Sequence, residues 1–407
     1  MIINFQAGEI IMKKYFLFAA ILSLLIGICG CSGFQSGTTT DIPEKPTLSR
    51  EFRGVWLRPP SDPDEIPAIM DQIRDAGFNA VMLETLYHGF TIFPGSNVPL
   101  RPEYQGRDVL AECIREAHER NLEIHCWTEV FYLQVDTEKY PDLPHSPILD
   151  EHPEWLLLTR DGEKSDVSEN AHIFADPANP QVQAFLLVYY ENLLRNYDID
   201  GINLDYIRYS AGSKDTGYTD FARKAFKNQE GVDPINIEKE ADAAMWMKWV
   251  EWRENRVTDF VSRVRSVAEE EKPEVLFSAA IFPGYYPRRG EHFTFQDWGD
   301  WLKKRYLDAI IPMAYAPTLD GIKGEINQVT KRNPGTALVL PALAISKEVE
   351  DAYGGRNHPH MKEQINLVRD MGLKGHSTFC YSWILQNKNG FEEFREDYKK
   401  PAASTIP

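Results

Sequence analysis

The sequence of 407 residues is poor in cysteine, in basic residues and in long apolar runs. Five cysteines, widely spaced, do not make a disulfide framework, so we expect Cys113, Cys126 and Cys380 to be buried free thiols, with a single disulfide as the alternative. The 44 basic residues are outnumbered by 61 acidic ones, which gives a net charge of −17. Nucleic-acid backbones bind basic surfaces, so this class of partner is excluded.

Several catalytic motifs are also absent. The sequence contains no G-x-S-x-G serine motif and no H-E-x-x-H zinc motif. No glycine-rich dinucleotide fingerprint follows the first predicted strand. Apolar residues make up 43% and charged residues 26% of the chain, which is ordinary for a soluble globular protein. The sequence therefore predicts a globular domain that uses neither a metal nor an organic cofactor.

The N-terminus has the pattern of an export signal. Two lysines precede an apolar run at 15–28, which is too short to span a bilayer comfortably as a helix. The run leads into the sequence I-C-G-C, which is similar to a bacterial lipobox and ends at Cys31. We therefore expect residues 1–30 to be a lipoprotein signal peptide and Cys31 to carry the lipid anchor. The alternative is an ordinary cleaved signal followed by an incidental cysteine.

The segment after Cys31 is typical of a tether. Residues 31–50 are rich in Ser, Thr, Gly and Pro and show no hydrophobic period. Ser32 at the position after the lipidated cysteine favours sorting to an outer membrane, so we expect a protein of the cell envelope that faces the periplasm or the cell surface. The folded domain is predicted at 51–400, followed by a tail at 401–407.

Short β-type apolar runs alternate with amphipathic helical patterns along the whole domain. The predicted strands are 52–58, 80–85, 122–129, 201–206, 276–282, 309–314, 337–342 and 375–381. The predicted helices are 62–76, 107–120, 179–196, 238–271, 294–306, 320–332, 358–371 and 390–399. Eight strand–helix pairs favour a closed (β/α)₈ TIM barrel over an open doubly wound sheet.

Two long insertions interrupt this rhythm. Residues 130–177 follow the third predicted strand and residues 207–237 follow the fourth. Both follow the carboxyl ends of strands, which is the side of a barrel where active sites form. In the helix predicted at 238–271, Trp249 and Trp252 recur with other apolar residues at helical spacing, so we expect them in the core.

The fourth predicted strand carries the clearest candidate for chemistry. In a strand, Ile202 and Leu204 share the face that packs on helices, whereas Asn203 and Asp205 point into the barrel. A carboxylate at this position is costly to bury unless it is partnered, and Arg208 is close enough in sequence to be that partner. Catalytic residues of barrels come from strand carboxyl ends, which favours a catalytic Asp205 over a purely structural Asp–Arg pair.

The third predicted strand supplies a second acid. Its alternation places His125, Trp127 and Glu129 on the lumenal face. A partly buried Glu129 beside Trp127 would have its charged form disfavoured, which suits a general acid. The alternative is a salt bridge between Glu129 and Arg208. Glu84, at the end of the second strand, is a competing acid.

Other polar and aromatic residues stand at or near strand ends and are candidates for substrate binding. Aromatic faces pack on the C–H face of a pyranose ring, while polar groups bind its hydroxyls. Together with the polar residues of the third and fourth strands, the candidates are Arg58, His88, His125, Trp127, Asn203, Tyr206, Arg208, Tyr315, Tyr381 and Trp383.

Three segments resemble a known family. These are E-F-R-G-V-W-L at 51–57, D-G-I-N-L-D-Y-I-R-Y at 200–209 and I-I-P-M-A-Y at 310–315. The sequence is similar to bacterial glycosyl-hydrolase-like proteins related to glycoside hydrolase family 10, over about residues 52–385. The resemblance implies a (β/α)₈ barrel and glycoside hydrolysis, and some lipoprotein members of this family cleave peptidoglycan strands stripped of their stem peptides.

The resemblance carries over to individual residues only in part. Asp205 matches the second aspartate of the fourth-strand motif, which implies a nucleophile or a stabiliser of the oxocarbenium ion. Family members often have Asn in the stretch that corresponds to 127–131, where this chain has Glu129, and Glu84 departs from the family pattern too. The general acid is therefore open between these two residues. Asp200 is expected to orient or cap.

The sequence as a whole predicts a lipid-anchored glycoside hydrolase with a two-carboxylate mechanism. The net charge disfavours polyanionic substrates. Glycan strands derived from peptidoglycan are the expected substrate, with another amino-sugar exopolysaccharide as the alternative. A second alternative is a glycan-binding lipoprotein without catalysis, since a fold does not establish an activity. Linkage, stereochemistry and oligomeric state are left open.

Overall fold

The computed structural model describes residues 48–164, 172–212, 214–284, 294–345, 358–387 and 390–399. The predicted signal at 1–30, the lipidation site Cys31 with nearly all of the tether, and the tail at 401–407 lie outside the described residues.

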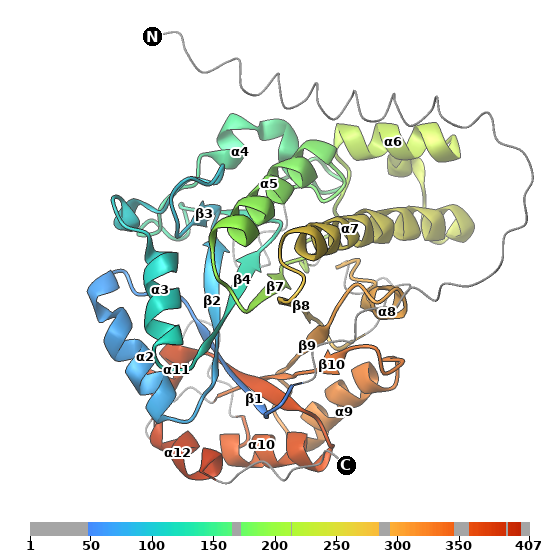
Figure 1. Ribbon diagram of the computed structural model, residues 1–407. Helices are drawn as coiled ribbons and strands as arrows, with labels where there is room; N and C mark the ends of the chain where they lie inside the picture. Colours follow the sequence, from blue (N-terminus) through green and yellow to red (C-terminus); the bar gives the residue numbers. More distant parts are fainter. Residues whose placement is uncertain are drawn as a thin grey trace, which may run out of the picture. The chain divides into compact units, whose positions relative to one another are not determined.

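Within these residues, eight parallel strands close into a barrel, and helices surround it (Figure 1). Each strand pairs with the next, and the last strand pairs back with the first. In barrel order they are β1 (Phe52–Leu57), β2 (Ala80–Tyr87), β4 (Glu123–Glu129), β7 (Gly201–Asp205), β8 (Leu276–Ile281), β9 (Ala309–Ala314), β11 (Ala342–Ala344) and β12 (Gly375–Phe379). The predicted (β/α)₈ barrel is therefore confirmed.

The seventh predicted strand, 337–342, is the one that the structure divides. Its first part is β10 (Leu338–Val339), which pairs with β9, and the barrel position itself is filled by β11. Pro341 stands between the two parts and has no N–H to donate to a neighbouring strand. Its carbonyl still accepts a hydrogen bond from the Ser377 N–H at 2.9 Å, so the chain stays beside β12.

The predicted helices are found with shorter ends. They are α2 (Ile66–Asp75), α3 (Val109–His118), α5 (Pro180–Asn196), α7 (Ala243–Glu271), α8 (Trp298–Lys303), α9 (Leu319–Thr330), α10 (Met361–Asp370) and α12 (Glu392–Tyr398). A short helix that the sequence pattern does not predict, α11 (Tyr381–Gln386), follows β12 at once. The predicted strand 375–381 therefore ends earlier, at Phe379.

Side chains alternate between two apolar layers, as the strand pattern predicts. Ile202, Leu204 and Cys126 belong to the outer layer between strands and helices. Trp127 lies in the inner layer, which fills the barrel lumen. The alternation expected for β4 and β7 is therefore confirmed.

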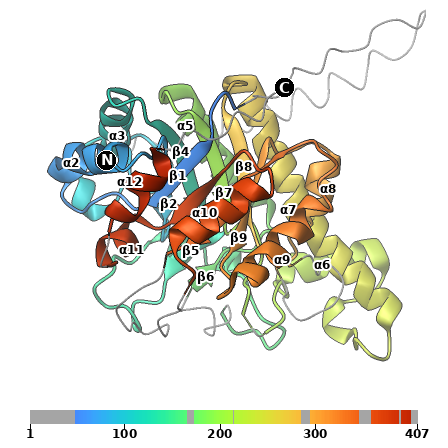
Figure 2. The same cartoon turned by 90° about the horizontal axis from the view of Figure 1, so that it is seen from below.

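The two insertions carry secondary structure of their own at one end of the barrel (Figure 2). The first holds a two-stranded antiparallel sheet of β5 (Tyr132–Val135) and β6 (His172–Phe174), with α4 (Ile148–Glu151) between them. The second holds α6 (Asp220–Glu230). A two-residue strand, β3 (Phe90–Thr91), turns back on the end of β2. These elements follow β2, β4 and β7 in the chain and lie at the carboxyl ends of these strands.

The tryptophans and cysteines predicted to lie in the core are mostly buried. Trp249 and Trp252 are buried, as predicted. Cys113 and Cys126 are buried free thiols, whereas Cys380 is free but only half-buried, because it lies at the mouth of the barrel after β12. Among the described residues, no helix is long and apolar enough to cross a membrane. The same part of the chain contains no group of three acidic, histidine or cysteine side chains placed to hold a metal ion.

Candidate active site

Three carboxylates gather where neighbouring strands end. Glu84 comes from β2, Glu129 from β4 and Asp205 from β7, and Glu129 and Asp205 are direct partners in the pairing of their strands. All three are buried, but only Asp205, at 9% exposed, has appreciable access to solvent. Their clustering follows from the topology, because all barrel strands run parallel and end on the same side.

Arg58 is the cation of this cluster. It follows β1, and two nitrogens of its guanidinium, Nε and Nη2, donate hydrogen bonds to the Glu84 carboxylate. The distance from Nη2 to Oε1 is 3.1 Å. The same Nη2 is 3.9 Å from Oε1 of Glu129. The side chain of Arg58 is half-exposed, whereas Glu84 is fully buried beneath it. The expected alternative of a Glu129–Arg208 salt bridge is therefore wrong, because Arg58 reaches Glu129 from β1.

Glu129 is held by one backbone donor. Its Oε2 accepts a hydrogen bond of 2.8 Å from the backbone N–H of His88. Burial raises the pKa of Glu129 well above its usual range, and the nearby charge of Glu84 raises it further, while Arg58 opposes both. The surroundings of Glu129 therefore favour its protonated form, which is the form that a general acid needs.

Asp205 has more hydrogen-bond donors. Its Oδ2 accepts from Nε1 of Trp127 at 3.0 Å, and its Oδ1 accepts from the backbone N–H of Tyr206 at 2.7 Å. Burial raises the pKa of Asp205 to about 6, against the lowering effect of Arg208 and of these two donors. With a pKa of about 6, Asp205 is mainly ionised at neutral pH, whereas burial and the charge of Glu84 favour the protonated form of Glu129.

The two backbone donors have an unusual conformation. His88 has a φ of 53° and Tyr206 has a φ of 49°, in the left-handed region that residues other than glycine seldom adopt. Each residue directly follows its strand, where the chain turns away from the barrel. The backbone N–H of His88 donates to Glu129, and that of Tyr206 donates to Asp205. Such backbone conformations cost roughly 1–3 kcal/mol and cluster at functional sites.

Aromatic rings surround Asp205 on the lumenal side. The rings of Trp56 and Trp127 meet edge to face at 5.0 Å. Phe379 lies 6.2 Å from Trp127, 5.9 Å from Tyr315 and 5.3 Å from Trp383. The structure therefore places Tyr315 and Trp383, both predicted substrate contacts, in one cluster of aromatic rings with Trp127.

On the other side, Arg208 and Tyr206 lie against the first insertion. The guanidinium of Arg208 is 4.7 Å from the ring of Tyr206 and 5.5 Å from the ring of Phe174 in β6. The ring of Tyr206 also packs on Tyr132 in β5, at 5.2 Å. These contacts hold the insertion against the end of β7.

Three predicted contacts lie away from the carboxylates. His125 is at the opposite end of the lumen, where it pairs with Glu123 at 3.1 Å. Asn203 lies one layer below Asp205 and donates to Oγ of Ser278 at 3.0 Å. Tyr381 lies on α11, and its hydroxyl donates to Gln72 of α2 at 2.7 Å, outside the barrel. Tyr381 points away from the lumen because the chain turns into a helix after Phe379, so the alternation of a strand no longer applies to it.

Sequence reasoning missed one exposed aromatic residue at the mouth. Phe282 directly follows β8 and is 37% exposed, and the guanidinium of Arg208 lies 5.2 Å from its ring. Its place on the same face as the lumenal Ala280 is the signal that could have identified it.

Comparisons with known proteins agree with this architecture. The family described as "Glycosyl hydrolase-like 10" matches residues 51–342. Glycosyl hydrolase YngK of Bacillus subtilis is 22% identical over 429 residues, which cover 94% of this chain and 77% of that protein. Glycosyl hydrolase DigH of Escherichia coli is 22% identical over 356 residues, which cover 74% of this chain and 75% of that protein.

Solved structures show the same fold. The PgaB (BpsB) glycoside hydrolase domain from Bordetella bronchiseptica has a TM-score of 0.65 at 16% identity, covering 85% of this chain and 98% of that one. An alpha-L-fucosidase from Paenibacillus thiaminolyticus has a TM-score of 0.62 at 16% identity, covering 86% of this chain and 49% of that one. Because the family match extends over most of the folded domain, this chain belongs to the glycosyl hydrolase-like 10 family, as its sequence motifs predicted.

Proposed function

We propose that this protein is a lipid-anchored glycosidase of the cell envelope that cleaves peptidoglycan-derived glycan strands with Glu129 and Asp205. The observation that carries the proposal is the contrast between these two neighbouring carboxyls. They are direct partners in the β4–β7 register, but their surroundings differ. Burial and the charge of Glu84 shift Glu129 toward its protonated form, whereas two hydrogen-bond donors and Arg208 limit the rise in the pKa of Asp205 to about 6. Pairs of acids whose surroundings separate their pKa values are typical of glycosidases.

In the proposed reaction, the Glu129 carboxyl gives its proton to the glycosidic oxygen as the bond to the anomeric carbon breaks. The Asp205 carboxylate faces the positive charge that develops on the sugar, either by attack or by electrostatic stabilisation. Water then adds its hydroxyl to the anomeric carbon and gives its proton to the Glu129 carboxylate. Where Asp205 has attacked, its bond to the anomeric carbon breaks in this step and the Asp205 carboxylate is restored. The general acid step contributes roughly 10²–10⁴-fold.

Glu84 has a different role in this proposal. It is fully buried and bound by two nitrogens of Arg58, so it is poorly placed to meet a substrate. Its negative charge raises the pKa of Glu129. In this proposal Glu84 and Arg58 act as positioning residues and Glu129 is the general acid.

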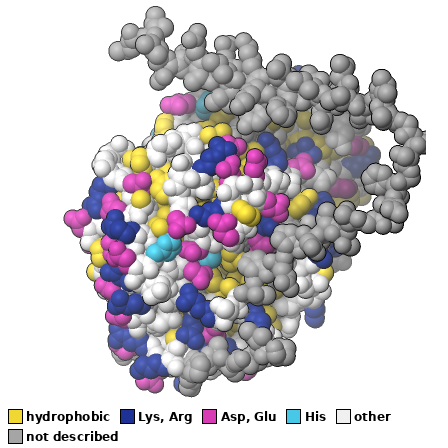
Figure 3. Space-filling model, in the orientation of Figure 1, with side chains coloured by type: hydrophobic (Ala, Val, Ile, Leu, Met, Phe, Trp, Pro, Cys, Tyr) yellow, Lys and Arg dark blue, Asp and Glu magenta, His cyan; other side chains and the backbone are white. Residues whose placement is uncertain are grey.

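The choice of substrate rests on charge and on the family. The chain carries a net charge of −17, and acidic and basic side chains are interspersed on the face drawn in Figure 3. Such a surface does not steer polyanions, whereas glycan strands freed of stem peptides carry less negative charge than intact peptidoglycan. An amino-sugar exopolysaccharide is the second candidate, because a cationic, partly deacetylated polymer would be attracted by the acidic chain.

The test uses residues 32–407 as a soluble protein. It is incubated with intact peptidoglycan and with peptidoglycan stripped by an amidase, and new reducing ends are followed by mass spectrometry. We expect cleavage of the stripped strands by the wild type and none by Asp205→Asn or Glu129→Gln. Asp198→Asn is the matched control, since Asp198 is a surface carboxylate away from the site.

Cleavage that persists in both variants would refute the assignment of the two carboxylates. Binding without cleavage by the wild type would instead favour the glycan-binding protein. Neither cleavage nor binding would direct the same assay to amino-sugar exopolysaccharides. Membrane anchoring is tested separately, by metabolic labelling with a fatty acid, which we expect Cys31→Ala to abolish.

A further inference from the structure

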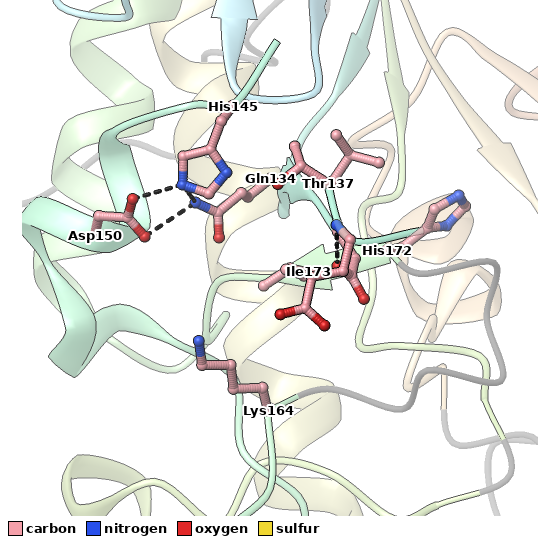
Figure 4. Close-up of a pocket in the computed structure, with 10 residues that line it drawn as sticks. Gln134, Thr137, His145, Asp150, Lys164, His172 and Ile173 are labelled. Atoms are coloured by element: carbon pink, nitrogen blue, oxygen red, sulfur yellow. Dashed lines mark hydrogen bonds and ion pairs between the residues drawn. The ribbon is translucent and has the colours of Figure 1, made fainter. Parts of the chain in front are cut away.

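A cavity lined mostly by polar side chains lies beside the β5–β6 sheet, and none of the three carboxylates of the cluster lines it (Figure 4). Its volume is about 340 Å³, which is at the lower end of the range for ligand sites, about 300–1,000 Å³. A cavity of this size suits one small polar unit rather than a long stretch of polymer. Its walls come from β5, from the loop that leads to α4, from α4 itself and from β6.

One wall of the cavity is a preformed hydrogen-bonding group. Gln134 is buried, and its Nε2 donates to the carbonyl oxygen of Ser146 at 2.9 Å and lies 3.2 Å from Oδ1 of Asp150. His145 pairs with Asp150 at 2.5 Å, as Figure 4 shows. An amide, a carboxylate and an imidazole are thus fixed side by side, although His145 and Asp150 remain about half-exposed.

The lining of the cavity is acidic. Among the described lining residues, three carboxylates face one lysine, Lys164, and two imidazoles. A hydrogen bond from His145 lowers the pKa of the Asp150 carboxyl. The carboxylate oxygens accept hydrogen bonds, so the surroundings disfavour an anion and suit a ligand with several hydroxyl or amide donors.

The cavity is linked to Asp205 through two residues in contact. His172 lines the cavity, stacks on Tyr132 at 4.2 Å and meets the ring of Tyr206 at 5.4 Å. The backbone N–H of Tyr206 is a donor to Asp205. His172 on the side of the cavity and Asp205 on the side of the carboxylates therefore both contact Tyr206.

We infer that the cavity is a distal subsite, which holds one neutral, hydroxyl-rich sugar residue of the glycan strand that is cleaved at Glu129 and Asp205. The inference rests on the proposed function for the identity of the strand. Gln134, His145 and Asp150 bind the hydroxyl or acetamido groups of this sugar. The subsite makes long strands better substrates than short ones, because only long strands reach it.

The test compares Asp150→Ala and His145→Ala with His152→Ala. His152 is a matched control, since it forms a similar half-exposed ion pair, with Glu154, in the same insertion but does not line the cavity. All three positions are exposed enough for the barrel to fold. Glycan fragments of increasing length are prepared from stripped peptidoglycan, and kcat/KM is measured for each length. Dissociation constants are measured for the same fragments by calorimetry.

We expect kcat/KM of the wild type to rise at the fragment length that first reaches the cavity. Asp150→Ala and His145→Ala should lose about tenfold for these long fragments and nothing for the shorter ones. His152→Ala should match the wild type at every length.

Equal losses for short and long fragments, or no loss in the two cavity variants, would overturn the subsite. Length-dependent binding that requires Asp150, in the absence of any cleavage, would keep the subsite and refute the proposed hydrolysis. Fragments that are neither cleaved nor bound would overturn both.

Discussion

Replacing Asp205 by asparagine should stabilise the folded protein at neutral pH while it abolishes activity. The pKa of Asp205 rises from its ordinary value of 3.8 to about 6 on folding, mainly because the carboxyl is buried. A shift of about two pH units corresponds to about 3 kcal/mol that the ionised carboxylate costs the folded state. Asparagine avoids this cost but loses one of the two hydrogen bonds, about 1 kcal/mol, which leaves a gain of about 2 kcal/mol.

The sign of the pH dependence follows from the direction of the shift. Because the folded-state pKa of Asp205 lies above the unfolded-state value, its contribution to stability is present below about pH 4 and is lost as the pH rises to about 6. Asp205→Asn should therefore melt about 3 °C above the wild type at about pH 8, and this advantage should vanish near pH 4. The assay is thermal unfolding followed by circular dichroism across this pH range.

Asp198→Asn provides the comparison. The Asp198 side chain is 83% exposed and pairs with Lys272, which lowers its pKa, so its replacement should give no stabilisation at any pH. An Asp205→Asn melting temperature that is below the wild type at about pH 8, or a difference that does not change with pH, would refute the reasoning. Stabilisation by loss of a catalytic group is the expected trade-off at an active site.

Three further predictions concern the same cluster. The kcat/KM of the wild type should decrease as the pH is lowered through about 6, because Asp205 becomes protonated, and a rate that stays unchanged in acid would contradict this role of Asp205. Glu129→Gln should remove most of the activity at every pH. Trp127→Phe keeps the ring but removes a donor to Asp205, so the acid limb of the pH profile should move up by about one pH unit, and an unmoved limb would argue against that hydrogen bond. Arg58→Met leaves Glu84 buried without its cation, so it should lower the free energy of unfolding by about 3 kcal/mol. The double variant Arg58→Met with Glu84→Gln should recover most of this loss. An Arg58→Met protein as stable as the wild type would refute the pairing.

Much of the site could be predicted from strand periodicity. Alternation along β4 and β7 placed Trp127, Glu129 and Asp205 in the lumen, and the structure agrees. The same rule fails for Tyr381, because the alternation of a strand ends where α11 begins. Helix and strand signals are local, so a change of secondary structure within a few residues redirects every side chain that follows.

The choice of ion-pair partners could not be predicted in this way. Arg208 is near Asp205 in sequence and was the natural partner for the acids. In the folded barrel, Arg58 binds Glu84 and approaches Glu129, because the end of β1 lies beside β2 in the sheet, and β2 lies beside β4. Contacts between residues far apart in the chain depend on this strand pairing and leave no mark in the local pattern.

The sequence by itself determined the eight-stranded alternation, the family, and the lumenal faces that carry Glu129 and Asp205. The tertiary structure decided which groups act on them: the Arg58–Glu84 pair, and the backbone donors of His88 and Tyr206 in their left-handed conformations. It also placed the β5–β6 sheet against Tyr206, beside the polar cavity. The physical reason is that periodicity fixes the direction of a side chain along its own strand, whereas its neighbours, its burial and hence its pKa are properties of the packed barrel.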